Sequence, residues 1–177
     1  MRRHPHRLRS DDYRGCLRFF LTIPTKFRKP HFTEASVAES AVLELLRTGR
    51  RCQFEISAYC FMPDHLHALV EGISIESNLT EFVRLFKQRS GYAFRRRAQT
   101  TLWQPGYYDR TVHDDKSEAA IIRYIVNNPC AAGLVTQCEE YPFWGSGVCT
   151  RDELAEFVGW QFEPAGEGGP LDDTRTV

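Results

Sequence analysis

The chain has 177 residues and a formal net charge of zero, because 23 Lys and Arg balance 23 Asp and Glu. That length fits one domain with an ordinary buried core and leaves little room for a second. No stretch approaches the roughly 20 apolar residues of a membrane span, and the Arg-rich N-terminus lacks the apolar run of a secretory signal. We therefore expect a cytoplasmic protein without membrane contact.

The balanced totals conceal an uneven distribution of charge. Residues 1–30 carry nine bases against two acids, residues 82–108 carry six bases and no acid, and residues 138–177 carry nine acids against two bases. Blocks of one sign usually form a solvated face or a tail. Bases interleaved with aromatic rings also suit a nucleic-acid groove, and charge alone leaves both interpretations open. The central basic block consists of Arg84, Lys87, Arg89, Arg95, Arg96 and Arg97.

The N-terminal part predicts an arm, a strand and a helix. Residues 1–15 are polar and basic without periodicity, and we expect an arm there. The apolar run from Cys16 to Ile23 predicts a buried strand that ends at Pro24. Between residues 38 and 46 the apolar positions recur at helical spacing. This amphipathic helix is expected to have a capping box and a terminal glycine, at Ser36, Glu39 and Gly49.

A hairpin and a second helix follow. Residues 53–60 alternate apolar and polar side chains, which predicts a strand. A turn at residues 62–64 and a returning strand from His65 to Glu71 complete the hairpin. Asn78 can cap the next helix, where residues 79–86 form an apolar stripe and the central basic block lies on the other face.

The remaining elements are a short strand and a third helix. The strand is expected over Tyr107–Val112. Ser117 can cap the helix, which should end near Asn128 because Pro129 follows. The element order predicts an α+β fold, a ferredoxin-like antiparallel sheet with helices packed on it. We expect three regions, namely the arm (1–15), one domain (16–150) and an acidic, partly disordered tail (151–177).

Two histidines open the second strand of the predicted hairpin. Side chains two apart in a strand point to one face, so His65 and His67 project together. The apolar residues between and beyond them, Leu66, Ala68 and Val70, face the opposite side. Neutral imidazoles placed in this way can share a divalent cation. Two hydrogen-bonded histidines on a partly exposed strand would have the same spacing, so the motif alone does not decide.

Tyr124 and Asn128 lie four residues apart on the third predicted helix. Such residues return to nearly the same helix face, so an amide oxygen and a phenol could point at one cation. Taken separately, a helix tyrosine is usually a core residue, and Asn128 before Pro129 is typical of a helix end.

Two imidazoles, an amide oxygen and open positions suit Mg²⁺ or Mn²⁺ better than zinc, whose structural sites prefer four nitrogen or sulfur ligands. Such a cation can polarise a scissile phosphate and align it with a tyrosine oxygen. The resulting phosphotyrosine ester conserves the energy of the broken bond for rejoining. These residue types are compatible with cleavage and rejoining of a nucleic-acid strand, but no single one of them proves this chemistry.

Four segments together resemble the single-tyrosine HUH transposases, and among them the REP-associated tyrosine transposases. FMPDHLHALVE contains the HUH motif as His65-Leu66-His67, and YIVNNPCAAGLV begins at Tyr124. LWQPGYYDRTVHDD and EEYPFWGS also occur in the family's order, and the resemblance covers residues 13–149. One departure is Cys130-Ala131, where relatives often carry a basic residue, which puts a DNA contact in doubt.

The resemblance implies a metal-dependent endonuclease and transposase acting on single-stranded DNA with hairpins, such as REP-type sites. Tyr124 would be the catalytic residue, joined to the 5′ side of the break, with His65, His67 and Asn128 around Mg²⁺ or Mn²⁺. We expect DNA contacts from the central basic block and from Arg123. The protein would be nucleoid-associated and either a monomer or a homodimer.

Two other functions remain open. A non-catalytic regulator of the same fold, which binds DNA or RNA hairpins, would also explain the basic blocks. A metal-dependent hydrolase of a small substrate would use the histidine pair but leave the basic blocks without a role. A denaturation-resistant protein–DNA adduct is expected for the strand-transfer enzyme alone.

Overall fold

The computed structural model describes residues 13–159, in which five strands form one antiparallel sheet of order β4-β1-β3-β2-β5. The α+β prediction with an antiparallel sheet is confirmed. The strands are β1 (Arg18–Pro24), β2 (Phe54–Met62), β3 (His65–Gly72), β4 (Tyr108–Val112) and β5 (Trp144–Gly145). The helices are α1 (Ala35–Cys52), α2 (Leu79–Ala98), α3 (Asp115–Ala131) and α4 (Arg151–Val158), with short 3-10 turns η2 (Lys26–Arg28), η3 (His31–Thr33) and η4 (Cys138–Glu140).

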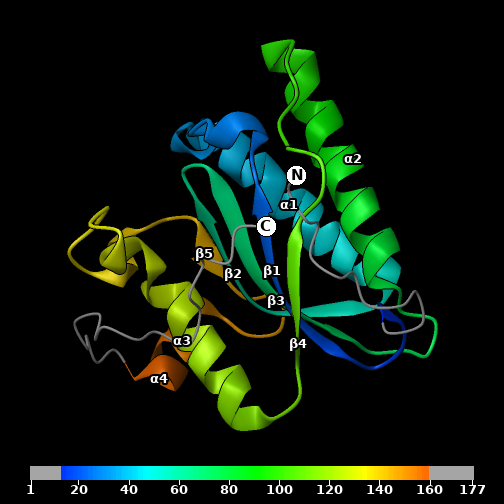
Figure 1. Ribbon diagram of the computed structural model, residues 1–177. Coiled ribbons are helices and arrows are strands. Elements are labelled where there is room, and N and C mark those ends of the chain that lie inside the picture. Colours follow the sequence, from blue (N-terminus) through cyan, green and yellow to red (C-terminus); the bar gives the residue numbers. More distant parts are fainter. Residues whose placement is uncertain (1–12, 160–177) are drawn as a thin grey trace, which may run out of the picture.

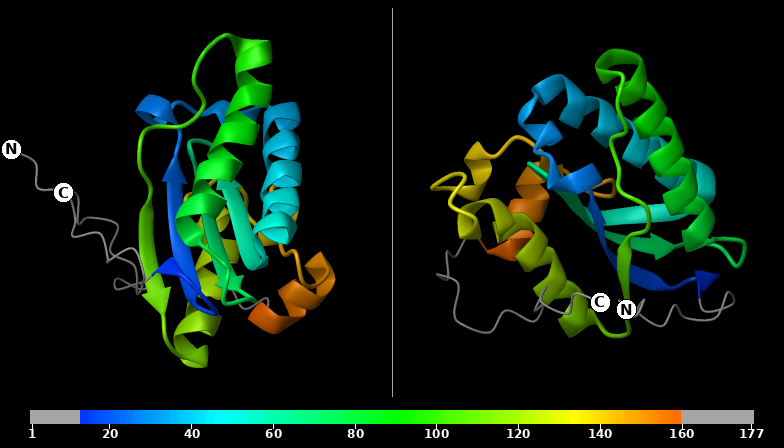
Figure 2. Two further views of the ribbon diagram at one scale, coloured as in Figure 1. Left: turned by 90° about the vertical axis from the view of Figure 1, so that its right-hand side faces the viewer. Right: turned by 45° about the horizontal axis from the view of Figure 1, so that its top comes forward.

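The sheet lies between two pairs of helices. In Figure 1, α1 and α2 cover one face and α3 and α4 the other, and the turned views of Figure 2 show the same arrangement. Two separate cores result. Strand alternation directs Leu66, Ala68 and Val70 to the core under α1 and α2, as predicted, and Leu69 to the core under α3 and α4.

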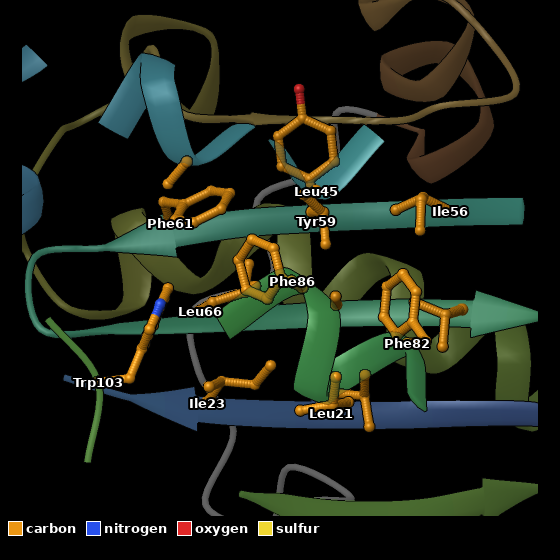
Figure 3. Packing of buried hydrophobic residues seen from close by; sticks show 14 of the residues in the cluster. Leu21, Ile23, Leu45, Ile56, Tyr59, Phe61, Leu66, Phe82, Phe86 and Trp103 are labelled. Atoms are coloured by element: carbon orange, nitrogen blue, oxygen red, sulfur yellow. The ribbon is translucent and has the colours of Figure 1, made fainter. Parts of the chain in front are cut away.

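Aromatic packing holds α2 on its face of the sheet. Phe82 and Phe86 extend from α2 onto Leu21, Ile23 and Leu66 of the central strands (Figure 3). All five side chains are fully buried, and each buried phenylalanine contributes about 1.5–3 kcal/mol of transfer free energy.

The boundaries of α1 differ from the prediction. The helix begins at Ala35 after Glu34, without the expected Ser36 cap, and continues through Gly49 to Cys52. Gly49 is required by packing, since a Cβ there would lie 2.9 Å from the carbonyl oxygen of Phe54. Gln53, in the left-handed conformation, ends the helix.

The helices α2 and α3 are both capped by side chains. Asn78 caps α2 as predicted, because its side chain accepts a hydrogen bond from the backbone N–H of Glu81. The prediction for α3 was wrong by one turn: Asp114 is the cap, and it accepts from the backbone N–H of Ser117 at 2.9 Å. The helix also continues past Pro129 to Ala131, beyond the expected end near Asn128.

Both ends of the expected domain contain structure that the sequence patterns did not indicate. Tyr13, within the expected arm, is buried and stacks on Phe19, with ring centroids 6.0 Å apart. The expected acidic tail begins with α4, whose Leu154, Ala155 and Val158 are buried. The rest of the expected arm and tail, residues 1–12 and 160–177, lies outside the described residues. Within residues 13–159, the helices are too short or too polar to cross a membrane.

Candidate metal and nucleophile site

The two histidines of β3 meet on the side of the sheet that faces α3. His67 is 1% exposed and His65 is half-buried. Their Nε2 atoms lie 2.9 Å apart, and the rings are nearly perpendicular, at 87°. The two Nε2 atoms share a hydrogen bond in the structure, and a cation bound by both imidazoles would take the place of that hydrogen.

Each imidazole is oriented by a partner at its other nitrogen. Asp64 Oδ1 lies 2.5 Å from His65 Nδ1, and Thr22 Oγ1 lies 3.0 Å from His67 Nδ1. Thr22 is opposite His67 in the β1–β3 register. A carboxylate only accepts, so Asp64 keeps the hydrogen on His65 Nδ1 and leaves Nε2 with its lone pair. A threonine hydroxyl both donates and accepts, so Thr22 suits either tautomer of His67.

Burial keeps His67 in its neutral form. Desolvation is the largest cause that lowers its pKa well below the ordinary value, and the charges of His65 and Arg28 lower that pKa further. Only a neutral imidazole has the lone pair that a metal requires.

Tyr124 of α3 lies against this pair. The ring centroids of Tyr124 and His67 are 5.4 Å apart at 71°, and Phe20 lies 5.9 Å from Tyr124 in an edge contact. Phe20 also stacks on His67, at 5.5 Å. Buried Ile121 and Ile125 anchor this part of α3 to the sheet. The structure thus brings together three of the four residues expected at the site.

The fourth residue, Asn128, lies one turn beyond Tyr124 and is half-buried. Its backbone carbonyl accepts from the N–H of Ala132 at 2.9 Å. Within the described part of the chain, no hydrogen bond joins Asn128 to either histidine. Its place as a metal ligand therefore stays a prediction.

The histidine pair fits a small divalent cation. Two ligands about 2.1 Å from an octahedral ion, at right angles, are about 3.0 Å apart, and the Nε2 separation of 2.9 Å is close to this value. Among residues 13–159 there is no cluster of three or more His, Cys, Asp and Glu that could hold a metal. A cation would therefore depend on the two imidazoles, an amide oxygen and ligands from the substrate.

Three contributors to this geometry were not predicted as site residues. Phe20 and Thr22 come from β1, and their position depends on a strand register that sequence periodicity does not give. Asp64 was interpreted only as a turn residue, although its place directly before His65 was a usable signal.

All six cations of the central basic block belong to α2, which packs with α1 on the opposite face of the sheet. Several already have partners. Arg84 pairs with Glu81 at 2.6 Å, and Arg97 pairs with Glu34 at 2.9 Å. Arg89 lies 3.8 Å from Glu44, on the α1 side.

Lys87 and Arg95 have different surroundings. Lys87 Nζ donates to the carbonyl oxygens of Gln104 and Gly106, each at 2.7 Å, and burial lowers its pKa to about 8. This lysine therefore fixes the loop that leads to β4. Arg95 is exposed beside a hollow of about 400 Å³, which Tyr92 also lines. Arg96 and Arg123 are both exposed, and Arg123 directly precedes Tyr124 on α3.

Thr22→Val should weaken Mn²⁺ binding by roughly 10- to 100-fold, the usual effect of removing a hydrogen-bond partner of a metal-binding histidine. Valine keeps the volume of threonine but cannot orient His67. The free Mn²⁺ signal in electron paramagnetic resonance measures the affinity directly. Thr48→Val is the matched control, because Thr48 is fully buried in α1 and its hydroxyl has no partner in the described structure. Equal affinities in the two variants would contradict the orienting role.

The sequence of the chain is similar to those of known transposases. The family model described as "Transposase IS200 like" matches residues 17–128. The REP-associated tyrosine transposase of Escherichia coli is 25% identical over 131 residues, which cover 71% of this chain and 73% of the relative. A Haemophilus influenzae protein that carries the same group name is 26% identical over 147 residues, or 76% and 82% of the two chains.

Solved structures share the fold. The structure of a REP-associated tyrosine transposase bound to a REP hairpin matches with a TM-score of 0.69 and 20% identity, over 80% of this chain and 82% of that one. A Deinococcus radiodurans structure described as a transposase matches with a TM-score of 0.50 and 23% identity, over 72% and 97% of the chains.

Proposed function

Since the chain belongs to the IS200-like transposase family, we propose that it cleaves and rejoins single-stranded DNA through a phosphotyrosine at Tyr124. The observation that carries this proposal is the contact of the Tyr124 ring with His67, whose Nε2 faces that of His65 at 2.9 Å. The proposed nucleophile on α3 and the proposed cation ligands on β3 thereby come from different elements into contact.

In the proposed reaction the Tyr124 phenol loses its proton, and its oxygen forms a bond to the scissile phosphorus. The bond from phosphorus to the 3′ oxygen breaks, and that oxygen leaves as a 3′-hydroxyl after taking up a proton. The protein then carries the 5′ phosphate of the downstream strand. Attack by a 3′-hydroxyl on the phosphotyrosine reverses these steps and joins the strands.

His65 and His67 would hold Mg²⁺ or Mn²⁺, with Asn128 as a third ligand. The bound cation would supply Lewis-acid polarisation of a phosphate oxygen. Phe20 and His67 limit the movement of the Tyr124 ring, which lowers the entropy cost of holding the phenol oxygen at a phosphate. As the substrate we propose single-stranded DNA with a hairpin, because the structural relative of the same fold is described with a REP hairpin bound.

The test is incubation of the protein with hairpin-containing single-stranded DNA and Mn²⁺, followed by denaturing electrophoresis. A strand labelled at its 3′ end should migrate with the protein, while a 5′-labelled strand should be released as a shorter fragment with a 3′-hydroxyl. Retention of the 5′ label would reverse the proposed polarity. Hairpin binding without any adduct, in both Mg²⁺ and Mn²⁺ and across sequences, would support a non-catalytic regulator instead.

Arg95→Ala should weaken DNA binding and reduce the slope of log affinity against log salt by about 0.7, the value for one lost contact with a single-strand phosphate. Arg95 is exposed beside the hollow that Tyr92 lines, so its guanidinium is accessible to a phosphate. Filter binding between low and moderate salt gives the slope. Arg97→Ala is the control, because Arg97 is paired with Glu34 and should change the slope less. An unchanged slope for Arg95→Ala would exclude this surface from the DNA path.

A further inference from the structure

The segment that joins β1 to η3, residues 25–30, has an unusual backbone. We call it the Thr25–Pro30 loop. Two consecutive residues other than glycine have a left-handed backbone conformation there: Phe27, with φ 60°, and Arg28, with φ 52°. Such conformations are disfavoured for residues with a Cβ and persist where the surrounding structure imposes them, commonly at functional sites.

Hydrogen bonds impose this shape. Thr25 is fully buried, and its backbone N–H donates to the carbonyl of Asp64 at 2.9 Å. Its hydroxyl lies 2.8 Å from the Lys29 carbonyl and 2.9 Å from that of Asp64. At the next position, Lys26 N–H donates to the Leu102 carbonyl at 2.8 Å. The loop is therefore fixed to the β2–β3 turn, beside which it lies in Figure 1.

The histidine pair follows this turn at the start of β3, so the Thr25–Pro30 loop borders the site. Arg28 Nη1 lies 3.6 Å from Asp64 Oδ2, while the other oxygen of Asp64 contacts His65. A single carboxylate thus connects a loop cation to a candidate metal ligand. A phosphate held at the histidine pair would have the positive charge of Arg28 close by.

The tip of the loop presents an aromatic ring among cations. Phe27 is 78% exposed, so its ring gains almost nothing from burial in the fold. Lys26 Nζ lies 5.3 Å from the ring centre, and Arg28 and Lys29 are exposed beside it. A single exposed apolar residue is ordinary on a protein surface. Phe27, however, combines an exposed ring with a disfavoured backbone conformation, and it lies on a fixed loop next to the site.

We propose that the Thr25–Pro30 loop binds the unpaired DNA strand beside the scissile phosphate, with Phe27 stacked on a base and Arg28 and Lys29 at the backbone phosphates. Proteins bind single strands by this combination of rings that stack on bases and cations that follow phosphates. The inference rests on the proposed function in two respects, that single-stranded DNA is the substrate and that its scissile phosphate lies at the histidine pair.

The test measures binding in a Tyr124→Phe background, so that cleavage does not enter. The probe is a hairpin with an unpaired flank that contains 2-aminopurine, whose fluorescence reports stacking. Phe27→Asn should weaken binding by roughly 5- to 100-fold, the effect of losing one base–aromatic contact. It should also abolish the fluorescence change at one flank position. Asparagine tolerates the left-handed conformation, so the melting temperature should not fall.

Three controls make the result specific. Phe27→Trp keeps an aromatic ring at this position, so its affinity for the flank should stay close to that of the unmodified loop. Phe157→Asn makes the same change at an exposed phenylalanine of α4 and should have no effect. Affinity for a blunt duplex, which offers no unpaired base, should be the same with and without Phe27→Asn.

Several outcomes would overturn the proposal. These are unchanged affinity for the flank in Phe27→Asn, an equal loss for the blunt duplex, and a large fall in melting temperature, which would assign the ring to the fold. A change of oligomeric state in light scattering would assign it to a subunit contact. Absence of the adduct in the unmodified protein tests the proposed function separately, because it does not alter the binding result for the loop.

Discussion

Tyr124→Phe is expected to abolish the covalent protein–DNA adduct, lowering its rate of formation by on the order of 10³-fold or more, as loss of a nucleophile does. The phenol oxygen is the atom that would bond to phosphorus. Phenylalanine keeps the ring that contacts Phe20 and His67, so the packing of α3 should survive. Denaturing electrophoresis measures the adduct, and hairpin affinity measured in parallel should stay close to that of the unmodified protein.

Tyr108→Phe is the matched control. Tyr108 pairs with Thr22 across β1 and β4 and is 39% exposed, so it is another phenol near the site on the same sheet. Its removal should leave adduct formation intact. An adduct that persists in Tyr124→Phe and disappears in Tyr108→Phe would transfer the nucleophile to β4.

The order of the elements was sufficient to predict the antiparallel sheet, and strand periodicity was sufficient to predict that the histidines lie opposite the apolar residues of β3. Periodicity predicts the face on which a side chain lies, because it depends only on residues two or four apart in one element. The contact between His67 and Thr22 joins residues 45 positions apart. It depends on how β1 aligns with β3, and both strands are apolar enough to allow other registers. The orientation of the imidazoles was therefore not predictable from the sequence.

The central basic block shows a different limit. A count of charges along α2 adds cations from several faces of the helix, and the sequence does not show which of them have acidic partners. Arg97 meets Glu34 although 63 positions separate them, and Lys87 is bound by backbone carbonyls. The role of this block in DNA binding therefore stays a prediction that rests mainly on Arg95 and Arg96, both exposed.

Two predicted helix ends were wrong because neighbouring residues make contacts that the sequence pattern does not show. Ser117 has the sequence features of a cap, but Asp114 precedes it by three residues and accepts both its N–H and its hydroxyl hydrogen. Gly49 has the features of a terminator, but close contact with the start of β2 requires a glycine inside the helix. Such errors move a boundary by one turn without moving Tyr124 away from the histidines.

The second large effect is expected for His67→Ala, which should weaken Mn²⁺ binding by more than about 100-fold, beyond the range for losing a residue that only orients a ligand. Adduct formation should fall with it, because the remaining imidazole of His65 gives the cation one nitrogen where the pair gives two. Removal of the ring also leaves Thr22 without its partner, so the free energy of unfolding should fall by about 1–3 kcal/mol. Circular dichroism at the assay temperature checks that the variant is folded.

His31→Ala is the control for this substitution. His31 is also partly buried, and burial is the main cause that lowers its pKa, but it packs against Phe94 on the other face of the sheet, with ring centroids 4.7 Å apart. Its removal should leave Mn²⁺ affinity and adduct formation unchanged. If folded His67→Ala bound Mn²⁺ as tightly as the unmodified protein, the cation would lie elsewhere. If it formed the adduct at the normal rate in Mg²⁺, the reaction at Tyr124 would not depend on the histidine pair.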